Sequence, residues 1–415
     1  MPTAAPSFAP PEPSLKARLR RAERLHHLKA GALILPLAAF LAVTFLIPIG
    51  DMMRRAVHDP ELAQVWPGVT AAIDDWQPRT EAPGEAVFAA LAADLGQSKA
   101  DRTLAVAARR LNSDYPGARS LLFSSARKLP ETAESWRATL IHIDERWAEP
   151  ELWAAIDRAS GPLTAFFLLQ AVDLERTPTG QLRPVPEQEA VFLDILGRTF
   201  AVALTVTLLC LALGFPVAYL LATLPPHLSN PMMILVLLPF WTSLLVRTAA
   251  WVVLLQDQGL VNNALIWLGL LDEPARLIFN RIGVIIAMTH VLLPFLVLPL
   301  YSVMKGIPKL YMRTALSLGA RPTVAFLKVY LPQTLPGIVA GTLLTFIIAL
   351  GYYITPALVG GAADQMISYF IAFYTAETVN WGMAAALGSV LLVTTLILFA
   401  TYARLVRAGA TPAGR

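Results

Sequence analysis

The residues with the clearest potential for interaction chemistry lie at positions 305–338, a stretch that contains five cations and no carboxylate. The cations are Lys305, Lys309, Arg313, Arg321 and Lys328. Pro308 and Pro322 each stand where a helix can begin, because a first-turn proline loses no hydrogen bond that it needed. Gly319 stands where a helix should stop, because glycine takes the left-handed cap conformation without strain. The pattern predicts two short helices joined at Gly319 on a membrane surface, a connector that another protein can push.

Motifs for catalysis and nucleotide hydrolysis are missing from the sequence. No GxxxxGK[ST] phosphate loop is present, and no lysine is followed by Ser or Thr. The six histidines have no metal-ligand spacing, and neither HExxH nor GxSxG occurs. We therefore expect no catalytic residue, no metal, no cofactor and no enzyme activity in this chain. Any ATP hydrolysis that drives it must take place on a separate subunit.

A second group of residues with possible chemistry lies inside apolar segments. Arg247 is costly at such depth unless it is paired or hydrated; it is either a residue of a translocation path or a side chain that snorkels or bonds to carbonyls. Aromatic rings attract organic cations, although membrane aromatics also serve as packing and interface anchors. The candidate path residues are Trp241, Arg247, Trp251, Tyr352 and Tyr353. His290 is interpreted as a packed histidine.

Composition sets the class of protein. Of 415 residues, 56% are hydrophobic and 15% are charged, which excludes an ordinary soluble enzyme. A span needs about 20 apolar residues, and six stretches qualify. These are residues 31–49, 199–223, 232–255, 282–304, 335–358 and 383–405. The fold class expected is therefore an all-α integral membrane protein with six transmembrane helices.

The charges predict the orientation. Cations dominate the N-terminal tail and the end of the chain, and an even number of spans returns both ends and the basic connector to one side. Beyond Asp194, the carboxylates are Asp257, Asp272, Glu273, Asp364 and Glu377, which this topology places on the opposite side. We expect both termini in the cytoplasm by the positive-inside rule. The high pI, about 9.2, then reflects topology and contact with membrane lipid, with no nucleic acid as a partner.

The chain divides into five expected parts. They are a basic cytoplasmic tail (1–29), a first transmembrane helix (30–50), a large helical extracytoplasmic insertion between helices 1 and 2 (51–190), a transmembrane core (191–406) that contains the basic connector (306–337), and a cytoplasmic tail (407–415). The insertion shows helical periodicity punctuated by prolines. The first apolar stretch is also compatible with a cleaved signal peptide, but its length and position favour a retained anchor.

The connector resembles the coupling loop of the membrane permeases of bacterial ABC importers. That loop reads Glu-Ala-Ala, three residues, Gly, nine residues, a branched apolar residue, one residue and Leu-Pro. The residues in register are Ala315, Gly319, Val329, Leu331 and Pro332, whereas Arg313 and Thr314 replace the Glu and the first Ala. Further matches at residues 239–251, 259–265, 355–361 and 380–386 resemble the spermidine/putrescine branch of the binding-protein-dependent (type I) class.

The resemblance implies a permease subunit in the bacterial inner membrane that forms half of a translocation channel. The implied partners are a cytoplasmic ABC ATPase dimer, a second permease subunit and a periplasmic solute-binding protein that delivers a small, polyamine-like solute. The residues expected to couple to the ATPase are Arg313, Ala315, Gly319, Ala320, Leu331 and Pro332. Leu316 and Phe326 are expected to anchor the loop to its own spans. A secondary transporter, or a membrane-anchored receptor with an extracytoplasmic sensing domain, is the alternative.

Overall fold

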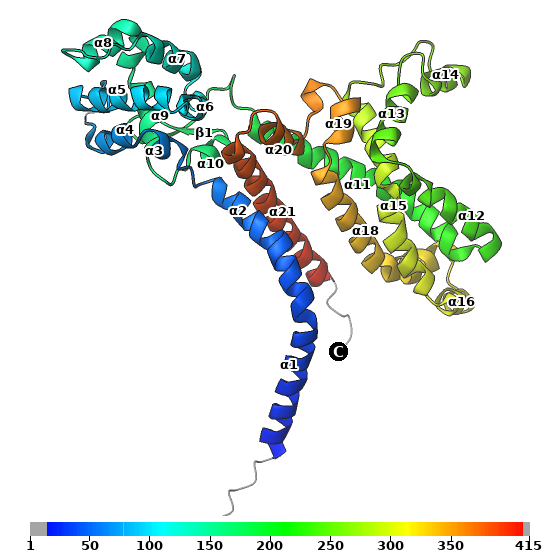
Figure 1. Cartoon of the computed structure of the whole chain (residues 1–415). Helices are drawn as coiled ribbons and strands as arrows, with labels where there is room; N and C mark the ends of the chain where they lie inside the picture. The colour runs from blue at the N-terminus through cyan, green and yellow to red at the C-terminus, as the bar shows by residue number, and fades with distance from the viewer. Residues whose placement is uncertain (1–14, 78, 410–415) are drawn as a thin grey trace, which may run out of the picture. The chain divides into compact units, whose positions relative to one another are not determined.

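The computed structural model of the protein describes residues 15–77 and 79–409 (Figure 1). The chain divides into two compact units, the first ending at Arg54 and the second beginning at Arg55. The predicted tails at 1–29 and 407–415 lie partly outside the described residues. We describe each unit by itself.

The first unit is one long helical rod. It consists of α1 (Leu15–Leu41), a π-helical turn η1 (Ala42–Leu46) and most of α2 (Ile47–Arg55). The segment Gly31–Arg55 is long and apolar enough to cross a membrane, as expected for the first predicted span. None of its apolar window is buried within the chain, so this helix depends on lipid or another protein to cover it.

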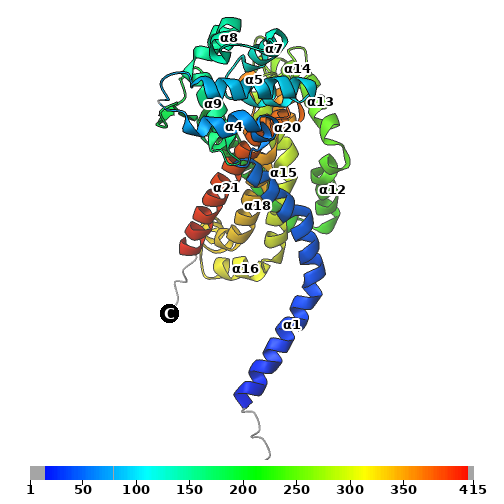
Figure 2. The ribbon, with the colours of Figure 1, turned by 60° about the vertical axis from the view of Figure 1, so that its left-hand side comes forward.

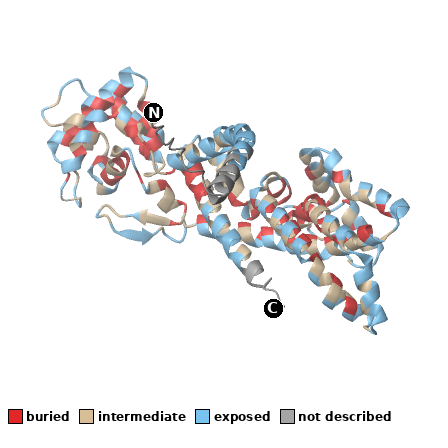
Figure 3. Ribbon diagram, turned by 90° about the horizontal axis from the view of Figure 1, so that it is seen from below, coloured by how far each residue is buried: buried red, intermediate tan, exposed pale blue. Residues whose placement is uncertain are grey.

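The second unit begins with a bundle of short helices, here called the α3–α9 bundle. Its elements are α3 (Glu61–Val65), α4 (Pro67–Ala72), η2 (Ile73–Asp75), α5 (Glu85–Ala100), α6 (Leu104–Asn112), α7 (Ala118–Lys128), α8 (Trp136–Ile143), η3 (Glu145–Ala148) and α9 (Pro150–Ser160). Trp66, Trp147 and Trp153 are fully buried at its centre with a surrounding set of leucines and alanines. Buried positions line its inner faces (Figure 3). Such a core accounts for the helical periodicity of this part of the sequence.

Acidic side chains close helix ends across the α3–α9 bundle. Asp94 on α5 accepts a hydrogen bond of 2.7 Å from the amide of Val69 in the first turn of α4. Glu85 accepts from Ser135 Oγ at 2.8 Å and from the amides of Trp136 and Arg137 at the start of α8. The first amides of a helix have no hydrogen-bond partner within it, and these carboxylates accept hydrogen bonds from them. The negative charge of each carboxylate also interacts favourably with the helix dipole.

The Glu85 contact predicts an acid-sensitive point. Desolvation raises the pKa of Glu85, but its three hydrogen bonds outweigh desolvation and hold the pKa below the usual value. A carboxyl whose folded-state pKa is lowered stabilises the fold above its unfolded pKa, and this contribution is lost as the pH falls through the folded pKa. The protection of the α8 amides, defined as the intrinsic exchange rate divided by the observed rate, should therefore fall as the pH is lowered below 4.5. Glu85→Gln should lower this protection already at pH 7.

Glu131→Gln is the matched control, since it removes an exposed carboxylate from the same bundle and should leave α8 unchanged. Equal protection of α8 in Glu85→Gln and the unmodified chain at pH 7 would show that the cap does not stabilise this helix.

A small β-hairpin follows the bundle and corrects the all-α prediction. After α10 (Phe166–Gln170), strands β1 (Leu174–Arg176) and β2 (Leu182–Pro184) pair antiparallel. Gly180, at φ +87°, provides the left-handed residue of the connecting turn. The sequence pattern missed these strands because each is three residues long and lies in a stretch rich in proline.

Three spans pack together in the membrane part of the second unit. They are α11 (Phe192–Thr223), α15 (Arg281–Gly306) and α18 (Leu331–Gly351), and they lie side by side (Figures 1 and 2). A Cβ on Gly337 would lie 2.9 Å from the Cβ of Val303, and one on Gly341 would lie 2.9 Å from the carbonyl oxygen of Leu296. These glycines therefore allow α18 to approach α15 closely.

The third predicted span, residues 232–255, is broken rather than continuous. It consists of α12 (Pro226–Leu237), the 3₁₀ turn η4 (Leu238–Trp241) and α13 (Leu244–Leu254), with a bend of 99° between the two parts. Pro239 lies in the turn, and Ser243 begins a new helix by accepting a hydrogen bond of 3.2 Å from the Val246 amide. The described residues thus hold five helices fit to span a membrane, or six if the bent pair is one span.

The remaining helices connect or close the spans. They are α14 (Leu260–Trp267), α16 (Lys309–Ser317), α17 (Pro322–Ala325), the π-helical η5 (Phe326–Tyr330), α19 (Ile354–Val359), η6 (Ala362–Asp364), α20 (Ile367–Ala376) and α21 (Trp381–Gly409). The predicted fifth span, 335–358, ends earlier as a regular helix, because the chain leaves the helix at Tyr352 and starts α19 two residues later.

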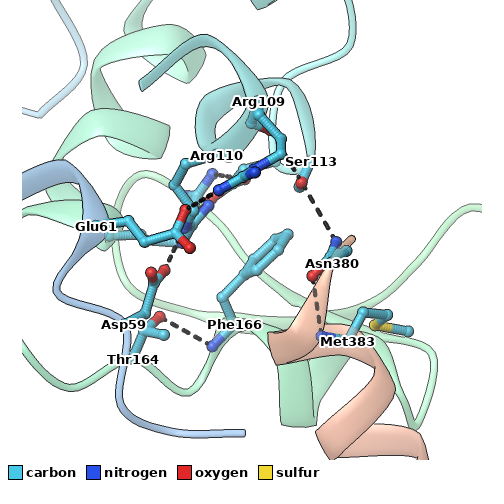
Figure 4. Close-up of polar contacts among 11 residues, drawn as sticks. Asp59, Glu61, Arg109, Arg110, Ser113, Thr164, Phe166, Asn380 and Met383 are labelled. Carbon is cyan, nitrogen blue, oxygen red and sulfur yellow. Dashed lines mark hydrogen bonds and ion pairs between the residues drawn. The ribbon is translucent and has the colours of Figure 1, made fainter. Parts of the chain in front are cut away.

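The region before α11 is attached to α21 and to α11. Asn380, just before α21, donates from Nδ2 to Ser113 Oγ at 3.4 Å (Figure 4). Phe167 of α10 packs directly over Gly382. The Asp173 carboxylate, beyond α10, accepts hydrogen bonds from the first amides of α11, the closest being Leu193 at 2.7 Å.

The Gly382 contact leaves no room for a side chain. A Cβ there would lie 2.3 Å from the Phe167 ring. Gly382→Ala should therefore force the ring or α21 to move and lower stability by about 1–3 kcal/mol. The double variant Phe167→Leu with Gly382→Ala should recover part of that loss, because the smaller side chain makes room.

Thermal unfolding of the purified protein measures both effects. Losses that simply add in the double variant would contradict direct contact between these two positions.

Candidate functional site

The first helix of the basic connector is closed by a complete Schellman motif. The amide of Ala320 donates to the Ala315 carbonyl at 3.1 Å, and the amide of Gly319 donates to the Leu316 carbonyl at 3.0 Å. Gly319 has φ +88°, and a Cβ built on it would meet nothing within 4 Å. This pattern is the one that glycine favours after a helix C-terminus. Glycine is therefore required here because of the positive φ, and not because neighbouring atoms leave no room for a side chain.

The sequence predicts that the second helix of the connector lies separately on the surface. In the structure, this helix is instead the start of the next span. The segment Pro322–Gly351 is one apolar helical stretch made of α17, η5 and α18. The wide π turn of η5 comes directly before Leu331 and Pro332. A proline lacks an N–H and crowds the carbonyl four residues earlier, so a wider turn there lets the helix pass it.

An aromatic cluster fixes this turn to α11. Phe326 stacks on Tyr330 with ring centroids 5.6 Å apart, and both rings meet Tyr219 edge-on at 5.6 Å and 5.4 Å. Phe326 thus packs against α11, in agreement with the prediction that it anchors the loop, whereas Leu316 is 42% exposed. The second half of the connector is thus attached to α11 through the aromatic side chains of η5.

The α16 helix is left open to a partner. In Figure 2 it runs across the lower ends of α15 and α18. It has no buried residue, and Leu310, Tyr311, Leu316 and Leu318 are exposed large apolar side chains. Arg313 and Lys309 are exposed as well. Exposed apolar and basic side chains together are typical of a surface that another protein covers.

A second group of functional side chains gathers where two helices are interrupted. Trp251 of α13 donates from Nε1 to His290 Nδ1 of α15 at 3.1 Å, with ring centroids 5.4 Å apart. Arg247 lies one turn before Trp251 on α13, and its Nε and Nη1 atoms are buried without a hydrogen-bond partner within the described chain. Nearby, the hydroxyls of Thr248 and Thr355 are 3.2 Å apart and join α13 to α19.

Comparison with known proteins assigns the chain to a family. The model for "Binding-protein-dependent transport system inner membrane component" matches residues 211–408. The Salmonella typhimurium (strain SL1344) spermidine/putrescine transport system permease protein PotB is 36% identical over 198 residues, which are 48% of this chain and 69% of that protein. The Escherichia coli (strain K12) PotB is 34% identical over 216 residues, 52% of this chain and 78% of that protein.

The chain belongs to this family of ABC importer permeases. Its relatives place it in the polyamine branch. A solved bacterial alginate ABC transporter, in complex with an alginate-bound periplasmic protein, matches 53% of this chain and 80% of its own with 21% identity and a TM-score of 0.43. Membership in the family makes this chain a multi-pass inner-membrane transport subunit.

The family match begins inside α11, so the α3–α9 bundle lies outside it. Both candidate sites lie within the matched residues. The family model thus accounts for residues 211–408, and the α3–α9 bundle is not part of that match.

The structure brings some predicted path residues together and leaves others apart. Arg247 and Trp251 lie one turn apart on α13, and His290, interpreted from the sequence as a packed histidine, is an exposed hydrogen-bond partner of Trp251, while Tyr352 is half-buried at the end of α18. Trp241 is 73% exposed at the end of η4, and Tyr353 is 41% exposed at the start of α19. No sequence signal paired His290 with Trp251, because they are 39 residues apart on different helices.

The described residues contain no group of three or more His, Cys, Asp or Glu side chains that could hold a metal ion. Neither candidate site is therefore a metal centre of this kind within the part of the chain that is described. The sites offer instead a docking surface and a cluster of hydrogen-bond donors.

The aromatic cluster leads to a testable prediction for the basic connector. Phe326→Ala removes the ring shared by Tyr219 and Tyr330 and should loosen η5, so amide hydrogen exchange in α16 and α17 should rise several-fold. Leu327→Ala is the control, because Leu327 is the adjacent residue and is 58% exposed. Equal exchange in the two variants would contradict an anchoring role for the ring.

Proposed function

We propose that this permease forms half of the translocation channel of an ATP-driven importer and that α16 is the lever through which a cytoplasmic ABC ATPase dimer moves it. The observation that carries the proposal is the exposed α16, which is closed at Gly319 and followed from Pro322 by one continuous helical segment that contains the span α18. A push on such a helix moves packed spans as rigid bodies. ATP hydrolysis takes place on the separate ATPase subunit.

The contact with the ATPase uses the small and basic residues of the loop. Ala315, Gly319 and Ala320 permit close approach at the end of α16, and Arg313 presents a charge beside them. Leu331 and Pro332 set the turn by which the loop enters α18. The apolar side chains exposed on α16 support a protein partner at this surface.

The topology proposed has six spans, with the bent α12–α13 pair counted as one. Both termini and α16 then lie in the cytoplasm, and residues 51–190 form an extracytoplasmic insertion between the first and second spans. The proposed parts are a tail (1–29), the first span (30–50), the insertion, the core (191–406) with the coupling loop (306–337), and a second tail (407–415). The basic residues around α16 support this orientation.

The solute proposed is small and polyamine-like, delivered by a periplasmic binding protein into a path shared with a second permease subunit. Support comes from the similarity to PotB proteins, which are named for spermidine and putrescine transport. Aromatic rings attract organic cations, and Trp241, Trp251, Tyr352 and Tyr353 border the proposed path with Arg247.

Substitution at Gly319 tests the coupling role. Gly319→Val should abolish ATP-driven uptake into proteoliposomes, because a β-branched residue at φ +88° costs roughly 1–3 kcal/mol and disrupts the end of α16. Membrane insertion should be unchanged. Gly306→Val is the control, since Gly306 also has open space for a Cβ but its φ is not positive.

Co-purification of an ATPase with the unmodified permease, and its loss in Gly319→Val alone, is the expected companion result. Normal uptake by Gly319→Val, or transport by this chain without any nucleotide-hydrolysing subunit, would overturn the proposed function.

A further inference from the structure

The short helix α14 has an apolar side that the described chain does not cover. It follows the third span, and Figures 1 and 2 show it at the end of the membrane part opposite α16. Trp267 is 84% exposed and Leu260 is 69% exposed. At 3.6 residues per turn, the exposed apolar positions lie on one side of the helix. This set, here called the α14 stripe, consists of Leu260, Ala264, Trp267 and Leu268.

The opposite side of α14 is fixed to the protein by one buried amide. Asn262 is fully buried, and its Nδ2 donates to the carbonyl oxygens of Gln256 at 3.1 Å and of Ala275 at 2.9 Å. Its Oδ1 accepts from the Ala275 amide at 3.0 Å. These bonds join the two ends of the loop that carries α14. The protein therefore sets the direction in which the α14 stripe faces.

The length of α14 is too short for a membrane crossing. Its 8 residues extend for about 12 Å, whereas the hydrocarbon layer is about 30 Å thick. The helix also has a defined end, because the Leu270 amide donates to the Leu265 carbonyl at 3.0 Å and Gly269 has φ +68°. An apolar helix of this length lies along a surface.

The charges around α14 favour lipid as the material that covers the stripe. Residues 260–271 contain no charged side chain, whereas Asp257 precedes them and Asp272 and Glu273 follow them. All three carboxylates are exposed. Carboxylates avoid hydrocarbon, so both ends of the segment stay at the polar level of the membrane while the apolar stripe between them can enter it. Tryptophan is enriched at this level, because its ring is apolar and its N–H is polar.

The apolar surface of the third span leads directly to α14. Leu245, Val246 and Val253 of α13 are each at least 60% exposed, and residues 255–259 alone separate α13 from α14. Because α13 is part of a membrane span, hydrocarbon is the medium that these side chains require. The same lipid can cover the α14 stripe without a further protein.

We propose that α14 is an interfacial anchor. It lies along the boundary between lipid and water with the α14 stripe buried in the lipid, and Asn262 sets this orientation. The anchor keeps the end of α13 at the depth of the membrane surface when the third span changes its bend. This interaction depends on the membrane location of the family, and not on the solute or on the ATPase.

Fluorescence quenching by brominated lipids tests the anchor in the purified permease, with the subunits that accompany it, in nanodiscs. Ala264→Cys places a thiol for a fluorescent maleimide within the stripe, and the one native cysteine, Cys210, is fully buried. Lipids brominated near the head group should quench this label several-fold more strongly than a label on Glu134→Cys, an exposed position of the α3–α9 bundle. They should also quench it more than lipids brominated at the far end of the acyl chain.

Asn262→Ala in the labelled chain should reduce this quenching, because α14 loses the bonds that orient it. Asn263→Ala is the matched control: Asn263 is exposed, and its Nδ2 donates to the Gln258 carbonyl at 3.3 Å. This variant should leave the quenching unchanged.

Three results would overturn the proposal. The first is a label at position 264 that a water-soluble quencher reaches and brominated lipid does not. The second is a label that neither quencher reaches, which would show that a protein partner covers this side of α14. The third is equal quenching with and without Asn262→Ala. The measurement needs neither ATP nor solute, so its outcome is separate from that of the uptake experiment with Gly319→Val.

Discussion

Within a membrane, every backbone N–H and C=O group needs a partner inside the protein, since lipid provides none. The permease meets this demand with continuous helices and, where it departs from them, with local side-chain bonds. Ser243 accepts from the Val246 amide after the bend in the third span. Beyond that bend, the Thr248 and Thr355 hydroxyls join α13 to α19. The breaks in these helices are therefore stabilised by specific side-chain hydrogen bonds.

The same demand is met outside the spans by acidic side chains that reach to distant helices. Asp94 and Glu85 close α4 and α8 within the α3–α9 bundle, and Asp173 closes α11 from the turn that precedes the hairpin. In each case one carboxylate binds amides that a helix cannot satisfy by itself. Asp59 uses a different partner: its carboxylate accepts from Nε of the buried Arg110, whose guanidinium also lies over the rings of Phe166 and Phe167 (Figure 4).

The sequence alone predicted the structural features that depend on composition and on single residues. Five of the six apolar stretches predicted as spans correspond to helices long enough to span, and Gly319 closes α16 as its type and position indicated. The sequence did not predict the break in the third span. Pro239 and Ser243 lie inside an apolar run, so hydropathy alone indicated a continuous helix where the chain bends by 99° between α12 and α13. The β-hairpin strands were too short to show alternation.

The candidate site was only partly accessible from the sequence for a related reason. Arg247 is conspicuous as a charge in an apolar segment, and aromatic residues near it could be named. The pairing of Trp251 with His290 depends on how α13 packs beside α15 after the bend, and no local pattern encodes that packing. Likewise, the contact of Phe167 with Gly382 joins positions more than 200 residues apart.

The double attachment before α11 has a mechanical consequence. Asp173 grips the first turn of α11, while Phe167 and Ser113 grip the first turn of α21 and the residue before it. These contacts therefore hold the N-terminal ends of α11 and α21 at a fixed distance from each other. A conformational change at this end of the permease must then move other helices, above all α12 and α13 on the two sides of the bend. The helices α11 and α21 would move together.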